Sequence, residues 1–199
     1  MPRILEDCSS TIEIKKSKFI TYLHRTNDEL EAKEYLRLIK KEHPQANHHC
    51  SAMIIGSIVR SNDDGEPSQT AGHPMLDVLL HHEMQDILAV VVRYFGGTKL
   101  GTGGLVRAYS SSVQEALNKA TLTESQIVSR YRIFFPYDLI GKFDHYFRSH
   151  DIEVTWKDYQ EKVEYQFISQ NDITTDIQEL SNGQVQPEFL ETIEMERPI

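Results

Sequence analysis

Residues 87–107 read ILAVVVRYFGGTKLGTGGLVR. The first six positions are all apolar, which is typical of a strand buried on both faces. Five glycines then fall within the nine positions 96–104, and Leu105, Ala108 and Val113 recur at helical spacing beyond them. The order predicted here is therefore a buried strand, a glycine-rich loop and a helix.

Upstream of this stretch, alternating apolar residues predict strands near 11–14 and 19–23, a helix from Asp28, and a short strand at 50–55. The connection from Ser61 to Pro74 is polar and longer than usual, which indicates a functional or mobile loop. A short helical segment follows at 75–80. This half of the chain is predicted to be an α+β sandwich.

The downstream half has a simpler pattern. Apolar residues alternate at period two near 127–135, 152–156, 163–167 and 189–195, and recur at helical spacing at 139–147 and 173–180. Ile127 shares its parity with Ile133, and Trp156 with Val154, so all four are expected to face the core. The order β-α-β-β-α-β is that of a ferredoxin-like domain, in which both helices cover one face of an antiparallel sheet.

Charge supports a division into two domains. The 199 residues carry a formal charge of −9. Residues 1–124 hold 14 basic and 16 acidic side chains, whereas residues 125–199 hold 7 and 14. We therefore predict an α+β protein with domains at 1–124 and 125–199. The composition excludes disordered, collagen-like and disulfide-scaffold classes. Without a membrane-length apolar run, an export signal or cysteine pairing motifs, the expected location is the cytoplasm, with no membrane partner.

The glycine-rich loop is the first candidate site. Backbone amides of such a loop, together with a helix N-terminus and nearby basic side chains, can bind phosphate. It is neither a Walker loop nor a GxGxxG dinucleotide turn, because the required Lys and third Gly are missing. Alternatively, the glycines only permit tight packing at a corner. The predicted ligand-binding residues are Arg93, Gly96, Gly97, Lys99, Gly101, Thr102, Gly103, Gly104 and Arg107.

The second candidate is the polar connection. Three carboxylates lie within four residues, a pattern that can hold Mg²⁺ through oxygen ligands. Alternatively, Asp64-Gly65 makes a turn and Ser68 or Thr70 caps the following segment, which explains most of the same residues without a metal. We expect this loop to share a cleft with the glycine-rich loop. The predicted cleft-lining residues are Asp63, Asp64, Glu66, Ser68 and His73. No other cofactor is expected.

The triplet His48-His49-Cys50 precedes a strand. Successive side chains of a strand point to opposite faces, so at most two of the three can reach one metal. A structural or hydrogen-bonding role is the better interpretation of these residues.

The two candidate loops together resemble the signature of the IMPACT/YigZ family. The motifs that carry this resemblance are DDGEPS at 63–68, TAG at 70–72, VRYFGG at 92–97 and KLGTGGLVRAY at 99–109. The resemblance implies a first domain with the fold of the second domain of a small-subunit ribosomal protein. For residues 125–199 it implies a ferredoxin-like domain similar to the last domain of elongation factor G, as in bacterial YigZ-type members. Gln69 departs from the pattern, since a glycine is frequent there.

The resemblance also implies a setting linked to translation regulation, with RNA, the ribosome or a protein as partner. Our leading hypothesis is a binding protein that recognises phosphate of RNA or of a nucleotide, for which catalysis is not required. One alternative is a metal-dependent enzyme acting on an anionic substrate. Another is a protein–protein interaction module. The sequence does not determine the oligomeric state.

Overall fold

The computed structural model describes all 199 residues, which form two compact units. Unit 1 comprises residues 1–124 and 197–199, and unit 2 comprises residues 125–196. The α+β architecture with two domains is that expected from the sequence. None of the helices combines the length and apolar character needed to cross a membrane.

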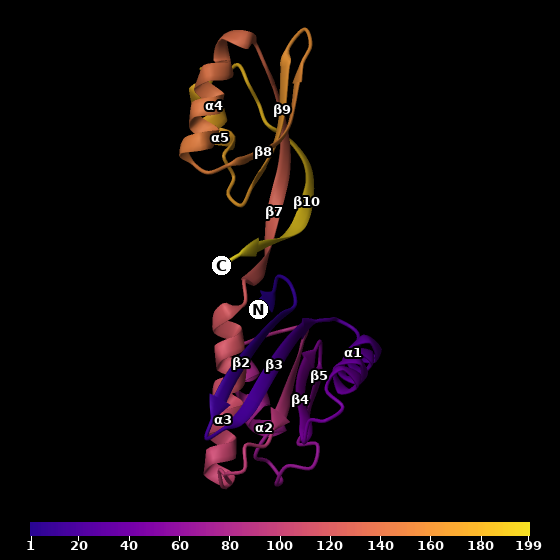
Figure 1. Cartoon of the computed structure of the whole chain (residues 1–199). Coiled ribbons are helices and arrows are strands. Elements are labelled where there is room, and N and C mark those ends of the chain that lie inside the picture. The colour runs from indigo at the N-terminus through magenta and orange to yellow at the C-terminus, as the bar shows by residue number, and fades with distance from the viewer. The chain divides into compact units, whose positions relative to one another are not determined.

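Unit 1 is a sheet covered by helices on both faces. Its strands are hydrogen-bonded in the order β2-β3-β6-β4-β5, each pair antiparallel. Helix α1 packs on one face, and α2 and α3 pack on the other (Figure 1). The elements are β1 (Arg3–Ile4), β2 (Cys8–Ile14), β3 (Ser17–Arg25), α1 (Glu29–Glu42), β4 (His48–Ile55), β5 (Ile58–Asn62), α2 (Gly72–His81), β6 (Ile87–Tyr94) and α3 (Thr102–Lys119).

Strand β6 lies at the centre of this sheet, and its first six residues are fully buried. Ile87 and Val91 contribute to the core under α2 and α3, whereas Leu88 and Val92 contribute to the core under α1. An uninterrupted apolar run is required because both faces of the strand are covered. The predicted doubly buried strand is confirmed.

The polar connection is shorter than the sequence predicted. Residues Ile58–Asn62 form β5, which pairs with β4 through Ala52–Ser61 and Met53–Arg60. The strand was missed because it is an edge strand with mostly exposed side chains, which leaves no alternating apolar pattern. The loop therefore begins at Asp63.

Unit 2 has the predicted β-α-β-β-α-β order. Its strands are arranged as β10-β7-β9-β8, and α4 and α5 cover the same face (Figure 1). Phe135, Phe143, Tyr165 and Phe167 form the centre of its core. Its elements are β7 (Leu122–Phe135), a 3₁₀ turn (Tyr137–Leu139), α4 (Ile140–Ser149), β8 (Glu153–Tyr159), β9 (Val163–Ser169), α5 (Thr174–Leu180) and β10 (Glu188–Pro198), the first and last of which extend into unit 1.

Two residues expected in this core are exposed instead. Trp156 is 56% exposed, because the β8–β9 register shifts between Val154 and Trp156 and places Trp156 beside Gln166 on the uncovered face. Ile127 is 72% exposed, because it precedes the part of β7 that pairs with β9 from Ser129 onward.

Candidate functional site

A cavity of about 520 Å³ opens in unit 1 where α3 begins. Its walls come from the start of β4, the loop after β5, the end of β6 and the glycine-rich loop. The residues that line it are Asn47, His48, Glu66, Pro67, Arg93, Phe95, Lys99, Leu100, Gly101, Thr102 and Leu105. Members of both candidate loops thus meet in one cavity.

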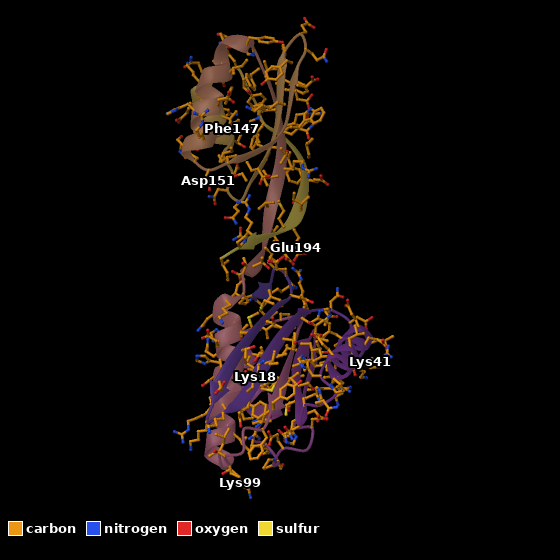
Figure 2. All side chains as sticks on the ribbon, viewed as in Figure 1. Lys18, Lys41, Lys99, Phe147, Asp151 and Glu194 are labelled. Atoms are coloured by element: carbon orange, nitrogen blue, oxygen red, sulfur yellow. The ribbon has the colours of Figure 1, made fainter.

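The N-terminus of α3 contributes backbone donors. Gly101 adopts a φ of 72°, in the left-handed region that favours glycine, and its carbonyl accepts the first helical hydrogen bond from Leu105. The amides of Thr102, Gly103 and Gly104 precede that bond, and no side chain caps them. Lys99 lies at this end of the unit (Figure 2) and adds a positive charge to the cavity wall. These groups match the requirements of an anion site.

Arg93 and Glu66 form a buried ion pair beneath the cavity. Nη1 of Arg93 donates to Oε1 of Glu66 at 2.5 Å, and the hydroxyl of Tyr109 donates to the same oxygen at 2.7 Å. Nε of Arg93 is buried without a hydrogen-bond partner. The guanidinium also lies 5.7 Å from the centroid of the Phe95 ring. Arg93 is therefore not the unpaired cation that the sequence indicated, because Glu66 neutralises it.

His48 lies beside this pair and is oriented by the backbone. Its Nδ1 donates to the carbonyl oxygen of Asp64 at 2.9 Å, since a carbonyl can only accept. Its Nε2 lies 3.7 Å from Oε2 of Glu66. The hydrogen bond from Nδ1 of His48 supports the hydrogen-bonding role predicted for the histidine triplet.

Behind Glu66, the Cys50 thiol is sealed from solvent. Its sulfur lies 3.0 Å from the carbonyl oxygen of Asp63 and 3.4 Å from the hydroxyl of Tyr109. Burial raises the pKa of Cys50 to about 12, and burial likewise raises the pKa of Tyr109 far above its usual value. Both groups stay protonated at neutral pH, so the network is structural rather than nucleophilic.

The carboxylates of Asp63 and Asp64 hold the loop in shape. Asp63 accepts hydrogen bonds from the amides of Gln69, Ala71 and Gly72, which brings the loop onto the start of α2. Asp64 accepts from Lys40 and from the amide of His49. The predicted turn at Asp64-Gly65 is present, with positive φ at both residues. The amides at the start of α2 are bound by Asp63, however, and not by Ser68 or Thr70, which were the predicted caps. No group of three or more His, Cys, Asp or Glu side chains is arranged to hold a metal ion.

Residues 15–117 match the family model described as the Impact N-terminal domain. The chain is also 42% identical to the IMPACT family member YvyE of Bacillus subtilis, over 86% of this chain and 82% of that protein. The chain belongs to the IMPACT family. It is 40% identical to the IMPACT family member YigZ of Escherichia coli, over 74% of this chain and 75% of that protein.

A solved crystal structure described as that of an hypothetical protein shares the fold of this IMPACT-family chain. The two are 33% identical and align with a TM-score of 0.61, over 96% of this chain and 97% of the other. The similarity extends across both units and agrees with the α+β, two-domain fold.

In this IMPACT-family protein, not every predicted site residue reaches the cavity. Of the nine predicted ligand-binding residues, Arg93, Lys99, Gly101 and Thr102 line it. Gly103 and Gly104 belong to the first turn of α3. Exposed Arg107 lies one turn further and donates to the carbonyl of Gly103.

The loop glycines and the acidic loop are placed differently. Gly96 approaches Lys16 so closely that an added Cβ would lie 2.0 Å from the Lys16 carbonyl carbon, and Gly97 has a φ of 85°. Of the five residues predicted to line the cleft, only Glu66 lines the cavity. Ser68 is exposed, and the exposed ring of His73 faces Asp77 at 3.6 Å.

The apolar part of the cavity was not predicted. Pro67, Phe95, Leu100 and Leu105 supply it, and the exposed ring of Phe95 directly precedes the glycine-rich loop. That position, between a buried strand and a predicted ligand loop, was the available signal. The glycines and charges beside it indicate polar contacts alone.

Proposed function

We propose that this IMPACT-family protein is a binding protein that holds a phosphate group of RNA or of a nucleotide in the cavity at the start of α3. We further propose that it acts in the cytoplasm in a setting linked to translation, which the family resemblance implies. Two unpaired cysteines suit a reducing compartment. No bond needs to be broken for this role.

The main support is the convergence of three uncapped amides and Lys99 at one end of α3. The amides of Thr102, Gly103 and Gly104 carry the positive end of the helix dipole, and Lys99 adds a full charge beside them. Phosphate oxygens can accept hydrogen bonds from all of these donors.

Arg93 gives a second support. Its buried Nε lacks a partner within the chain, although the residue lines the cavity. Because Glu66 already balances its charge, Arg93 would orient the bound group more than attract it. We therefore assign the principal electrostatic attraction to Lys99.

The test is titration of the full chain with inorganic phosphate, a nucleoside monophosphate and short RNAs at two salt concentrations. Lys99→Ala is expected to weaken binding about tenfold, as for a lost hydrogen bond to a charged group, and to flatten the salt dependence. Lys119→Ala is the matched control, because it removes the same charge from the last turn of α3, where Lys119 pairs with Glu115. Unchanged affinity in Lys99→Ala would reject the site.

Arg107→Ala separates the two ligand classes. Arg107 lies outside the cavity, so its loss is expected to leave binding of a monophosphate nearly unchanged. An RNA strand that continues along α3 would instead lose affinity and salt dependence in this variant. Equal losses for both ligands would place the anion nearer Arg107 than the cavity.

A protein-interaction module is the second candidate, because exposed aromatic side chains lie on the uncovered sheet face of unit 2. Trp156 is 56% exposed and Phe134 is 46% exposed. They pair with Gln166 and Glu164 of β9, whose side chains point to the face opposite the core. Exposed aromatics of this kind are frequent in interfaces. Co-sedimentation of the full chain with ribosomes distinguishes the candidates: Lys99→Ala lowers it if the cavity binds RNA, and Trp156→Ser lowers it if the sheet face docks.

The metal-dependent enzyme has less structural support. Asp63 and Asp64 do not line the cavity, and their carboxylates accept hydrogen bonds from the chain. A Mg²⁺-dependent rise in melting temperature that Asp64→Asn abolishes would restore this alternative.

A further inference from the structure

The floor of the cavity presents hydrogen-bond acceptors in addition to the donors at its mouth. Oε1 of Glu66 already accepts two hydrogen bonds, from Arg93 and from Tyr109. Oε2 has no hydrogen bond within the chain, although the Glu66 side chain is only 3% exposed and lines the cavity. A carboxylate oxygen in this position can accept a hydrogen bond from a ligand.

A second acceptor lies beside it. Because Nδ1 of His48 carries the proton that it donates to the Asp64 carbonyl, the neutral tautomer that fits this bond has its lone pair on Nε2. Nε2 is 3.7 Å from Oε2 of Glu66, too far for a hydrogen bond between them. One group with two N–H bonds can serve both acceptors, and an amino group is the simplest such group.

The apolar part of the cavity lining suits an aromatic ring. Phe95 is 46% exposed and lines the cavity, where Leu100 and Leu105 add apolar surface. Nucleobases stack on exposed aromatic rings of this kind. A volume of about 520 Å³ also lies within the range of pockets for small organic ligands.

We propose that the cavity selects nucleotides whose base carries an amino group, which donates to Oε2 of Glu66 and Nε2 of His48 while the base stacks on Phe95. This selection rests on the proposed function, since the phosphate of the same nucleotide accepts hydrogen bonds from the amides at the start of α3, beside Lys99. Cytosine, adenine and guanine carry such a group. Uracil has a carbonyl where cytosine has its amino group, and hypoxanthine has a hydrogen where guanine has its amino group. A carbonyl oxygen that faces the Glu66 carboxylate is repelled.

The experiment is calorimetric titration of the full chain at pH 8 with CMP, UMP, GMP and IMP. CMP and UMP differ at the amino position, and IMP is GMP without its amino group. We expect CMP to bind at least tenfold more tightly than UMP, and GMP at least tenfold more tightly than IMP.

Glu66→Gln provides the sharper test, because it exchanges an acceptor for a donor at nearly constant shape. Its amide oxygen can still accept from Arg93 and Tyr109, while its NH₂ replaces Oε2 at the cavity. The preference is then expected to reverse, with UMP binding more tightly than CMP. Should this variant not fold, Phe95→Ala remains, which is expected to weaken all four nucleotides together because stacking does not depend on the base.

The outcomes separate the two proposals. Equal binding of all four nucleotides, still lost in Lys99→Ala, would keep the phosphate site and overturn selection of the amino group. A CMP preference that persists unchanged in Glu66→Gln would also overturn it. Binding of none of the nucleotides and no inorganic phosphate would remove the proposed function itself.

Discussion

Glu66 accepts a 2.5 Å hydrogen bond from the guanidinium of Arg93, and neither side chain is more than 7% exposed. The pair joins the loop after β5 to the end of the central strand β6. Removing one member leaves the other as an uncompensated charge in a poorly solvated site. The pair therefore connects the architecture of the cavity to the stability of unit 1.

Glu66→Ala is expected to lower the free energy of unfolding by about 3–5 kcal/mol, the usual cost of breaking a buried ion pair. Glu34→Ala is the control, because its partner Arg37 and Glu34 itself are each 56% exposed and such surface pairs contribute about 1 kcal/mol or less. Urea denaturation measures both. A loss below about 1 kcal/mol in Glu66→Ala would contradict the view that the pair is structurally important.

Gly96→Ala is expected to destabilise the protein by more than about 3 kcal/mol, because the new methyl group would overlap the backbone of Lys16 and Ser17. Gly103→Ala serves as its counterpart in the first turn of α3. An added Cβ there meets nothing within 4 Å, so alanine should stabilise the helix by about 0.5–1 kcal/mol. Thermal unfolding gives the melting temperatures of the two variants. Similar melting temperatures would refute the predicted difference in stability.

Asp64 is expected to make the free energy of unfolding depend on pH. Partial burial opposes ionisation of Asp64, but the amide of His49 and the ammonium of Lys40 favour it, so its pKa lies below the usual range. The folded state then binds fewer protons than the unfolded state near this pKa. The contribution is complete above the unfolded pKa of about 3.9 and is lost as the pH falls through the lower folded value.

Urea midpoints of the wild type and of Asp64→Asn, measured between pH 6 and pH 3, test this dependence. The difference between the two proteins is expected to shrink as the pH falls, because protonated Asp64 resembles asparagine. A constant difference across this range would show that Asp64 does not contribute through its charge.

Cys50 is expected to resist thiol reagents in the native protein. It is fully buried, and burial raises its pKa to about 12, so almost no reactive thiolate exists at pH 8. Cys8 is partly exposed and should be the residue that reacts, although burial, followed by Asp7 and Glu6, raises its pKa as well. Mass spectrometry after labelling of wild type and Cys8→Ser checks this expectation. Rapid labelling of native Cys8→Ser would contradict it.

The architecture was largely predictable because it follows from short-range patterns. The uninterrupted apolar run at 87–92 required a strand covered on both faces, and the β-α-β-β-α-β order of unit 2 followed from alternation. The position of Trp156 did not, because a one-residue register shift reverses the face of every following side chain without a sequence signal.

The candidate site was predictable in outline only. The local sequence is enough to predict a glycine at positive φ and a cationic Lys99. The neutralisation of Arg93 by Glu66 depends instead on a contact between residues 27 positions apart. Gln69 illustrates the reverse case. Gln69 has a φ of 62°, a conformation that favours glycine. This explains why a glycine is frequent at this position in the family pattern, from which Gln69 departs.

The close approach of Gly96 to Lys16 has a consequence for engineering. Turns between antiparallel strands usually tolerate extra residues, and the turn at Lys15 and Lys16 looks suitable for a peptide tag. Here the carbonyl of Lys16 abuts Gly96, and the hydroxyl of Ser17 accepts from the Gly96 amide at 3.1 Å. Lengthening this hairpin would displace the entrance to the glycine-rich loop 80 positions away, so tags belong elsewhere on the chain.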